Sequence, residues 1–257
     1  ESTVELAKTH KWFEDNFIRG KTSISIFKEL SLKTIPLFDF SGITSFSSIF
    51  YGCKNLESIP LINTSNGTDF SMLFFNCENL KSIPLVDTSN GTDFNKTFSG
   101  CKNLESITIP DSVVLIGGGA FEACINLKSV VLSKATSSIE HFAFSGCKKL
   151  ENITIPKSVV FIGGCAFEDC ESLETINIPE YTISIENNAF SGCKNLKNIS
   201  IADSLTSIGD NAFEDCESLE EINIPDSVTS IGNDAFEDCK SLKNVTIPDS
   251  VMFIGEE

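Results

Sequence analysis

The sequence predicts a solenoid of leucine-rich-repeat type, closed at its N-terminal end by a capping helix. A cysteine returns at steps of 24, 24 and then 23 residues, leucine and isoleucine follow it at fixed offsets, and turn residues separate the apolar segments. Such a period indicates coils that cannot bury their apolar faces alone and therefore stack. We expect a right-handed solenoid with a parallel strand ladder on its concave face and short strands and helical turns on its convex side.

Two parts are expected: a helical cap over residues 1–31, and a solenoid of about ten coils over residues 32–257, the last coil being incomplete. Apolar residues at helical spacing indicate an amphipathic helix over residues 3–18, whose polar face would close the open end of the stack. These residues are Leu6, His10, Phe13 and Phe17.

The first coil is expected to be degenerate. Leu32 and Ile35 lie 24 residues before Leu56 and Ile59, and Glu29 stands where this spacing would place a cysteine. The coil therefore keeps the apolar frame but not the thiol.

The next two coils share the turn Thr-Ser-Asn-Gly-Thr-Asp-Phe, at residues 64–70 and 88–94. Asn-Gly favours left-handed backbone geometry, so this segment predicts a tight turn. Later coils use Ile-Pro-x-Ser-Val instead, so two subfamilies of coil are expected in one stack.

The coil that begins at Cys216 shows the later pattern. Residues 219–224 end in apolar-polar alternation, which predicts a short strand, and Pro-Asp-Ser then turns the chain. Residues 227–232 are expected to form a second extended stretch, closed by a glycine suited to positive φ. Asp210 or Asn233 is then expected to cap a helical turn that carries alanine and phenylalanine inward.

Nine of the ten cysteines occupy one equivalent position per coil. In-register Cβ atoms of stacked coils stay about 5 Å apart, farther than a disulfide prefers, so we expect a buried row of reduced thiols that act as small hydrophobic residues. No Cys-x-x-Cys spacing is present to hold a metal ion. Cys165 alone breaks the register, at an expected turn, and is the thiol expected to be reachable from solvent. The row is Cys53, Cys77, Cys101, Cys124, Cys147, Cys170, Cys193, Cys216 and Cys239.

The sequence offers little chemistry for catalysis, so we predict neither an enzyme nor a cofactor. His10 and His141 are the only histidines, and neither lies in a motif that would pair it with a nucleophile. Ile-Gly-Gly-Gly-Ala at residues 116–120 lacks the lysine and the spacing of a phosphate-binding loop. Acid pairs such as Glu214-Asp215 are not part of a calcium-binding loop, so they are expected to form a solvated outer face with no metal bound.

The remaining candidate site is the polar side of the strand ladder. If the aliphatic residues of each strand face inward, the alternating residues face solvent on the concave side. Such small hydrogen-bonding side chains can bind an extended peptide, a protein loop or a glycan, or they can be a merely solvated sheet face. Exposed Tyr, Trp and Arg, which mark tight interfaces, are missing from them, and this favours weak, multivalent binding. The candidate ligand-binding residues are Ser106, Thr108, Asn152, Thr154, Thr175, Asn177, Asn198, Ser200, Glu221, Asn223, Asn244 and Thr246.

Charge is distributed unevenly. Residues 1–97 carry 9 basic and 11 acidic residues, whereas residues 98–257 carry 10 and 25, which together give the net charge of −17. The acidic region would repel phosphate groups, so nucleic acid is not expected as a partner. No run of 18 apolar residues is present, so we expect no membrane insertion, and residues 1–20 lack the apolar run of a signal peptide.

The later coils read roughly Cys-x-x-Leu-x-x-Ile-x-Ile-Pro-x-Ser-Val-x-x-Ile-Gly-x-x-Ala-Phe. They resemble the BspA-like leucine-rich repeats of the Treponema pallidum type over about residues 47–255. Members of that family are commonly bacterial or protist surface proteins, some of them implicated in adhesion to host matrix proteins or to other cells. The Asn-Gly coils are similar to repeats in surface and phage-associated proteins of gut bacteria. The resemblance implies an extracellular or cell-surface location, with a virion as the alternative.

Two functions follow from these patterns. The first is a non-enzymatic binding or adhesion module that presents its concave strand face to a protein or glycan ligand. The second is a structural spacer, or a component of a virion or surface assembly, that contacts partners through its ends and edges. The last coil breaks off after Ile254-Gly255, and an exposed parallel strand there invites pairing, including self-association through the C-terminal coil.

Overall fold

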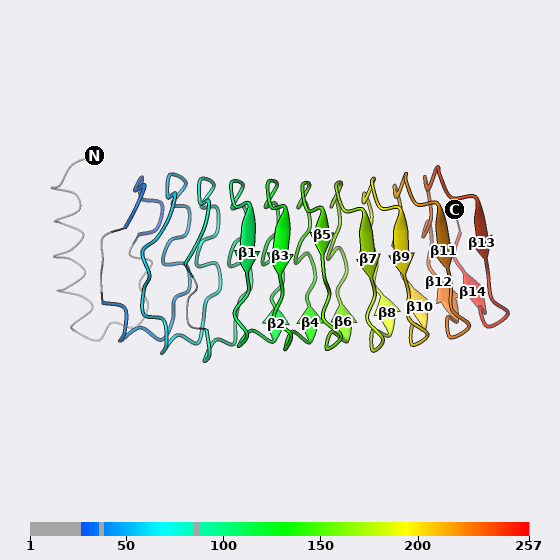
Figure 1. The fold of residues 1–257 in the computed structure, drawn as a ribbon, viewed down its shortest axis with the longest axis horizontal. Coiled ribbons are helices and arrows are strands. Elements are labelled where there is room, and N and C mark those ends of the chain that lie inside the picture. Colours follow the sequence, from blue (N-terminus) through cyan, green and yellow to red (C-terminus); the bar gives the residue numbers. More distant parts are fainter. Residues whose placement is uncertain (1–26, 36–38, 85–87, 257) are drawn as a thin grey trace.

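The computed structural model describes residues 27–35, 39–84 and 88–256. These residues form one stack of coils with two rows of short parallel strands running along it (Figure 1). The parallel strand ladder expected from the repeat is therefore confirmed. The cap helix expected over residues 3–18, including His10, lies outside the described residues.

Each later coil contributes one strand to each row. In the first row, hydrogen bonds join β1, β3 and β5, and separately β7, β9, β11 and β13; the second row divides in the same way after β6. The first row consists of β1 (Ser106–Thr108), β3 (Ser129–Val131), β5 (Asn152–Ile153), β7 (Thr175–Asn177), β9 (Asn198–Ser200), β11 (Glu221–Asn223) and β13 (Asn244–Thr246). The second row consists of β2 (Leu115–Ile116), β4 (Ser138–Ile139), β6 (Phe161–Ile162), β8 (Ser184–Ile185), β10 (Ser207–Ile208), β12 (Ser230–Ile231) and β14 (Phe253–Ile254).

The coils before β1 stack through isolated parallel bridges, Ser45 to Asp69 and Asp69 to Asp93. The expected Asn-Gly turn is present, since the Gly67 N–H donates to the Thr64 carbonyl at 2.8 Å, but left-handed geometry was the wrong reason for it. Neither glycine of these turns has a positive φ. Glycine is needed at Gly67 because a Cβ there would lie 2.6 Å from the ring of Phe70.

Two details predicted for the later coils are also wrong. Gly209 and Gly232 do not have positive φ; a Cβ on Gly209 would instead lie 2.6 Å from the backbone nitrogen of Asn187 in the preceding coil. Asp210 does not cap its own turn, because its Oδ1 accepts a hydrogen bond from the Asn233 N–H of the next coil at 2.7 Å. Gly209 and Asp210 therefore serve the close stacking of successive coils rather than the conformation of their own coil. The turns that were expected to be helical are hydrogen-bonded turns, and they form no helix in the described residues.

The first described coil has a different register from the one predicted. Phe27 stacks on Phe50 with ring centroids 5.3 Å apart, and the Leu30 N–H donates to the Phe27 carbonyl as Cys53 does to Phe50. Leu30 therefore stands in the cysteine position, and Glu29 is the residue before it. The 24-residue spacing misled the prediction because this coil is one residue shorter between its cysteine and leucine positions.

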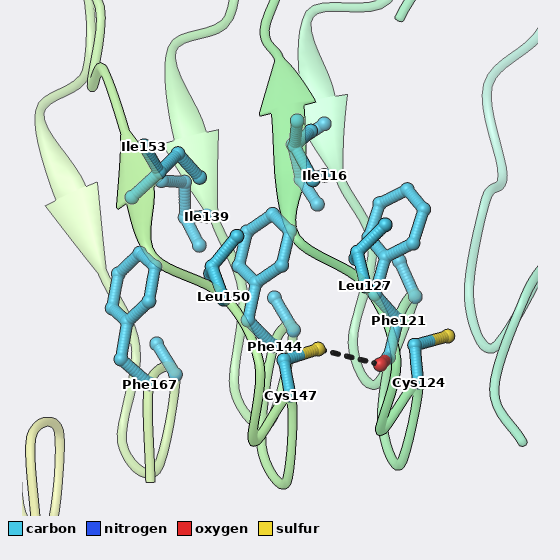
Figure 2. Packing of buried hydrophobic residues seen from close by; sticks show 14 of the residues in the cluster. Ile116, Phe121, Cys124, Leu127, Ile139, Phe144, Cys147, Leu150, Ile153 and Phe167 are labelled. Atoms are coloured by element: carbon cyan, nitrogen blue, oxygen red, sulfur yellow. Dashed lines mark hydrogen bonds between the residues drawn. The ribbon is translucent and has the colours of Figure 1, made fainter. Parts of the chain in front are cut away.

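The core consists of side-chain ladders that run the length of the stack. Phe144 stacks on Phe121 and on Phe167, with ring centroids 5.2 and 5.3 Å apart and interplanar angles of 4° and 8° (Figure 2). Leu150 and Cys147 lie beside these rings and are fully buried. Each coil thus covers the apolar face of its neighbour, as the repeat requires.

The residue before each cysteine adopts a left-handed conformation. At Asn76 and Asp169, φ is 55° and 54°; at Gly100 and Gly192, one coil further on, φ is 74° and 71°. A Cβ on Gly192 would lie 2.5 Å from the Asp169 carboxylate oxygen, and one on Gly100 would meet the Asn76 amide oxygen. Each polar side chain therefore folds over the glycine of the next coil.

Candidate functional site: the exposed strand face

The strands of the first row hold two side chains outward and one inward. Ile107, Val130 and Ile176 are buried central residues, whereas the residues on both sides of them are exposed. Successive side chains of a strand point to opposite faces, so a single apolar residue fixes the direction of its two neighbours. We name the exposed side of this row the strand face.

All twelve residues predicted as ligand-binding lie on the strand face and are exposed. Parallel pairing brings them into register: Thr175 pairs with Asn198, Asn198 with Glu221, and Glu221 with Asn244. The companion residues on the other side of each central residue form a second line, as Asn223 and Thr246 do. The structure thus gathers the predicted residues into two lines along the stack.

Two further residues belong to the strand face and were missed. Ser129 pairs with Ser106 and with Asn152, and Val131 pairs with Thr108. The Ile-x-Ile-Pro pattern is replaced by Val-Val-Leu-Ser in this coil, so a search for the motif passed over it. Counting five and seven residues on from the cysteine would have found both residues. Val131 is 59% exposed and interrupts the polar line with an apolar side chain.

The strand face offers unsatisfied hydrogen-bonding groups. Six of the twelve side chains carry hydroxyls, five carry amides and one, Glu221, carries a carboxylate. Within the part of the chain that the structure describes, none of the twelve makes a side-chain hydrogen bond to another protein group, in contrast to the polar side chains of the turns. Their donors and acceptors are open to solvent or to a ligand.

Ion pairs between coils border the strand face. Lys128 Nζ lies 3.1 Å from Glu105, and Lys197 Nζ lies 3.5 Å from Glu174, each pair joining the residues that precede two neighbouring strands. All four side chains are at least half exposed, so each pair contributes little to stability. The main effect of these ion pairs is to neutralise charge at the border of the strand face.

The thiol row has the predicted burial and adds hydrogen bonds that were not predicted. Cys124 and Cys147 are buried free thiols, and each donates to a phenylalanine carbonyl of the preceding coil at 3.1 Å. Burial raises the pKa of Cys124 to about 12 and that of Cys53 to about 11. These thiols stay protonated at neutral pH, which makes them poor nucleophiles and poor metal ligands.

Cys165 is the partly exposed thiol that its position predicted, and Cys239 in the last coil is half-buried as well. Burial, together with the nearby Glu168 carboxylate, raises the pKa of Cys165 to about 11. His141 lies on an exposed turn, where its Nδ1 accepts a hydrogen bond from the Gly164 N–H at 2.8 Å. That hydrogen bond joins two neighbouring coils, and its donor is a backbone N–H rather than a nucleophile.

Acid pairs line the turns outside the core. Ser145 and Ser191 donate to Glu168 and Glu214 of the following coils at 3.0 and 3.2 Å. Among the described residues, no group of three or more His, Cys, Asp or Glu side chains is arranged to hold a metal ion. Asp234 and neighbouring carboxylates raise the pKa of Glu237, as expected for acids that are close together without a counter-ion.

A cavity of about 560 Å³ lies where the Asn-Gly coils meet β1. Its wall is mainly apolar and includes Phe74, Phe98 and Ile107, with Thr88 and Ser106 as polar groups. Residues 85–87 follow directly on Pro84 in this wall and lie outside the described residues, so we assign no ligand to the cavity.

A stack of coils with a short parallel strand on one side and a buried frame of leucine and isoleucine defines the class of leucine-rich-repeat proteins. A family model described as the BspA type leucine rich repeat region matches in six copies, over residues 92–184 and 160–257. This match covers more than half of the chain, and the protein therefore belongs to the BspA-type leucine-rich-repeat family. A second model, described as a Mycoplasma protein of unknown function, matches residues 21–110, which include the Asn-Gly coils.

Solved structures of two bacterial leucine-rich repeat proteins share the fold, and a third is similar in sequence. A leucine-rich repeat protein of Eubacterium ventriosum is 24% identical, with a TM-score of 0.64; the alignment covers 90% of this chain and 65% of that one. A T. pallidum leucine-rich repeat protein is 22% identical over 82% of this chain and 77% of its own, with a TM-score of 0.51. A leucine rich cell surface protein of Faecalibacterium prausnitzii is 24% identical over 88% and 77%, with a TM-score of 0.46. No curated protein sequence matches the chain.

Among the residues that the structure describes, no helix is both long enough and apolar enough to cross a membrane.

Proposed function

We propose that the protein is a non-enzymatic binding module that holds an extended protein or glycan ligand along the strand face. One observation carries the proposal: twelve polar side chains stand in two in-register lines, exposed and without hydrogen-bond partners in the described protein. A solvated sheet face requires no such uniformity of small, mostly uncharged side chains. A ligand with repeating donors and acceptors would meet equivalent groups about every 4.8 Å along the stack.

The composition of the strand face favours many weak contacts. It carries no Tyr, Trp or Arg among the twelve residues, and these are the side chains that dominate tight interfaces. Linking several weak contacts in one ligand raises the overall affinity through effective concentration. We therefore expect affinity to rise with the length of the ligand.

Bulky substitutions test this site. The triple variant Thr154→Tyr, Asn177→Tyr and Ser200→Tyr fills the strand face without charge and with a residue that suits strands. Screening wild type on arrays of glycans and matrix proteins identifies a ligand, and the variant should then lose most of the binding. Unchanged binding by the folded variant would overturn the strand-face site.

The second strand row provides a matched control. Val114, Val160 and Ile183 are 50%, 49% and 61% exposed, at equivalent positions of three coils just before β2, β6 and β8. Their replacement by tyrosine adds comparable bulk on a different face and should leave binding unchanged. Loss of binding in this control variant alone would move the site to the second row.

Display at a cell surface is part of the same proposal. It is supported by the family to which the chain belongs, because the proteins that these repeats resemble are commonly surface proteins. An antibody against the solenoid should label intact source cells. Labelling of purified virions alone would favour the second function below.

The second candidate is a structural spacer or assembly component that makes contacts through its ends. In the described residues, Phe253 and Ile254 of β14 are 59% and 58% exposed. Deletion of residues 239–257 should then abolish assembly, whereas the tyrosine variants of the strand face should assemble normally.

A further inference from the structure

The turns between the two strand rows carry one exposed charge per coil. A backbone hydrogen bond closes each turn: the Val159 N–H donates to the Pro156 carbonyl at 3.0 Å, and the Thr182 N–H donates to the Pro179 carbonyl at 3.1 Å. The second residue of each turn is charged and exposed. We name these residues the turn line: Asp111, Lys134, Lys157, Glu180, Asp203, Asp226 and Asp249.

The charges of the turn line are grouped rather than alternating. Its two lysines lie in neighbouring coils, and acidic residues occupy the next four coils. One residue after the cysteine, by contrast, lysine and glutamate alternate from Lys148 to Lys240, and Lys148 pairs with Glu171 at 2.8 Å. Within the described residues, no side chain of the turn line forms an ion pair. An alternating line neutralises itself within one stack, whereas a grouped line leaves both signs of charge open to a partner.

Two apolar side chains are exposed beside the middle of the turn line. Val160 and Ile183 lie just before β6 and β8 in neighbouring coils and are 49% and 61% exposed. Ser137 and Thr206 flank them at equivalent positions, and their hydroxyls donate to carbonyls of the preceding coils at 3.3 and 2.9 Å. The polar members of this row are therefore satisfied within the stack, and the apolar pair gains from being covered.

We infer that this side of the stack is a dimerisation surface for a second copy of the chain. The two-fold axis lies between the coils of Lys157 and Glu180 and is perpendicular to the stack, so the two stacks run antiparallel. A two-fold interface brings the same patch of both subunits together, and each contact occurs twice. Lys157 then lies opposite Glu180 of the partner subunit, and Lys134 lies opposite Asp203 of the partner subunit. The grouped charges that stay unpaired in one stack are paired between two.

The same axis covers the apolar pair, since it places Val160 opposite Ile183 of the partner subunit at the centre of the contact. Charge selects this register over its neighbours. An axis one coil nearer the N-terminus would place Lys134 opposite Lys157 of the partner subunit, and an axis one coil nearer the C-terminus would place two acidic residues opposite each other. An axis through either central coil, or one parallel to the stack, would place like charges in contact.

The dimer should be weak. Its attractive pairs span four coils, about 19 Å of the stack at about 4.8 Å per coil. Beyond them, Asp111 lies opposite Asp226 of the partner subunit, and this pair is repulsive. The buried area therefore stays below the roughly 1,200 Å² that is typical of stable complexes. This inference goes beyond the proposed function, and the dimer leaves the strand face of each copy uncovered.

The test uses the full chain and two double variants. Lys134→Glu with Lys157→Glu makes all four central charges acidic, and Glu180→Lys with Asp203→Lys makes all four basic. Sedimentation gives the mean mass between about 10 μM and about 1 mM protein in about 0.15 M salt, which screens the long-range repulsion of the acidic chains. The wild-type mass should rise from 28.0 kDa toward twice that value. Each variant alone should associate at least about tenfold more weakly, because every attractive pair becomes repulsive.

An equimolar mixture of the two variants restores all four pairs and should recover the association constant of wild type. The matched control, Lys149→Glu with Lys243→Glu, reverses two exposed lysines outside the turn line that have no ion pair in the described residues. It has the same net charge as the first variant and should associate as wild type does.

The basic variant separates local pairing from net charge, because it is less acidic than wild type and should nevertheless lose association. Variants that associate as wild type does, or a mixture that stays monomeric, would overturn the inference. So would a wild type that stays monomeric near 1 mM, and the surface would then belong to a different partner. None of the variants changes a strand-face residue, so loss of the dimer and loss of ligand binding are measured separately.

Discussion

The thiol of Cys147 donates a hydrogen bond to the carbonyl oxygen of Phe121, in the preceding coil, at 3.1 Å (Figure 2). The same bond recurs in every coil of the row, from Cys53 bonding to Phe27 through Cys239 bonding to Phe213. Cysteine is therefore more than a small apolar residue here. It fills the space beside the phenylalanine ladder and joins each coil to the one before it, at a lower cost of desolvation than a hydroxyl would have.

Replacing Cys147 by alanine should lower the free energy of unfolding by about 1–2 kcal/mol, through a small cavity and the lost hydrogen bond. The Phe121 carbonyl keeps its bond from the Cys124 N–H, so no acceptor is left bare. Urea denaturation followed by circular dichroism measures the change. Cys165→Ala is the control and should stay within about 0.5 kcal/mol of wild type, because this thiol is partly exposed and lies outside the row.

Thiol alkylation should separate the cysteines by burial. In the folded protein, Cys165 and Cys239 should react first and slowly, since the pKa of each is raised to about 11. Cys124 and its buried equivalents should react only on unfolding. Mass spectrometry of peptides after timed alkylation gives the order. Rapid modification of Cys124 in the folded protein would contradict the buried row.

Gly209→Ala should destabilise the stack strongly, by about 2–4 kcal/mol, because the added methyl meets the backbone of the preceding coil. Its Cβ would lie 2.6 Å from the Asn187 nitrogen and 2.8 Å from the Glu186 carbonyl carbon. Gly118→Ala is the matched control: the nearest atom to its Cβ is the Asn95 side-chain oxygen, at 3.2 Å, which can move. Thermal melting of the two variants should differ clearly; equal melting would refute the stacking role of Gly209.

Stability should fall on acidification through the Glu78 ion pairs. Hydrogen bonds from Lys102 and Lys54 lower the pKa of Glu78 below its ordinary value of 4.5. A carboxyl with a lowered folded-state pKa contributes stability above the unfolded-state value and loses it as the pH falls through the folded-state value. The lysines are exposed and Glu78 is partly exposed, so the two ion pairs together contribute at most about 1 kcal/mol. Glu78→Gln should lower the melting temperature at pH 7 and leave it unchanged near pH 2.

Glu237→Gln should have the opposite effect. The pKa of Glu237 is raised, chiefly by Asp234, then by desolvation and by Glu214 and the other nearby carboxylates. Its ionised form is therefore disfavoured in the folded protein, and the penalty is present above the folded-state pKa and disappears below the unfolded-state value. The variant should melt at a higher temperature than wild type at pH 7 in low salt, and the gain should shrink as salt is added. An unchanged melting temperature in low salt would contradict the repulsion.

Repeat spacing was sufficient to predict the strands, the core ladders and the side on which the candidate residues lie. Cys147, Leu150 and Ile153 recur at fixed offsets, and equivalence between coils implies stacking in register. The exposure of Thr175 and Asn177 follows from the alternation around Ile176. These features depend only on which residues of successive coils are equivalent, and the repeat spacing gives that equivalence.

Features that depend on contacts between coils could not be predicted. Gly209 looked like a residue chosen for its own φ, and Asp210 like the cap of its own turn, because local sequence shows only local geometry. Their partners, Asn187 and Asn233, lie one coil away in each direction. The position of Leu30 was missed for a related reason. Its coil has one residue fewer between the cysteine and leucine positions, which shifts the sequence alignment, whereas the backbone stays in register with the next coil.

Side chains that fold over the glycine of the next coil have a consequence for how such genes lengthen. Because the Asp169 side chain occupies the space above Gly192, a coil with a polar side chain before its cysteine is best followed by a coil with glycine at that position. The unit that recombination can add or remove without a steric conflict is therefore a pair of coils. Copy number should then drift in even steps. Asp215 followed by Asp238 is the odd step in this chain, and it lies beside the carboxylates that repel one another.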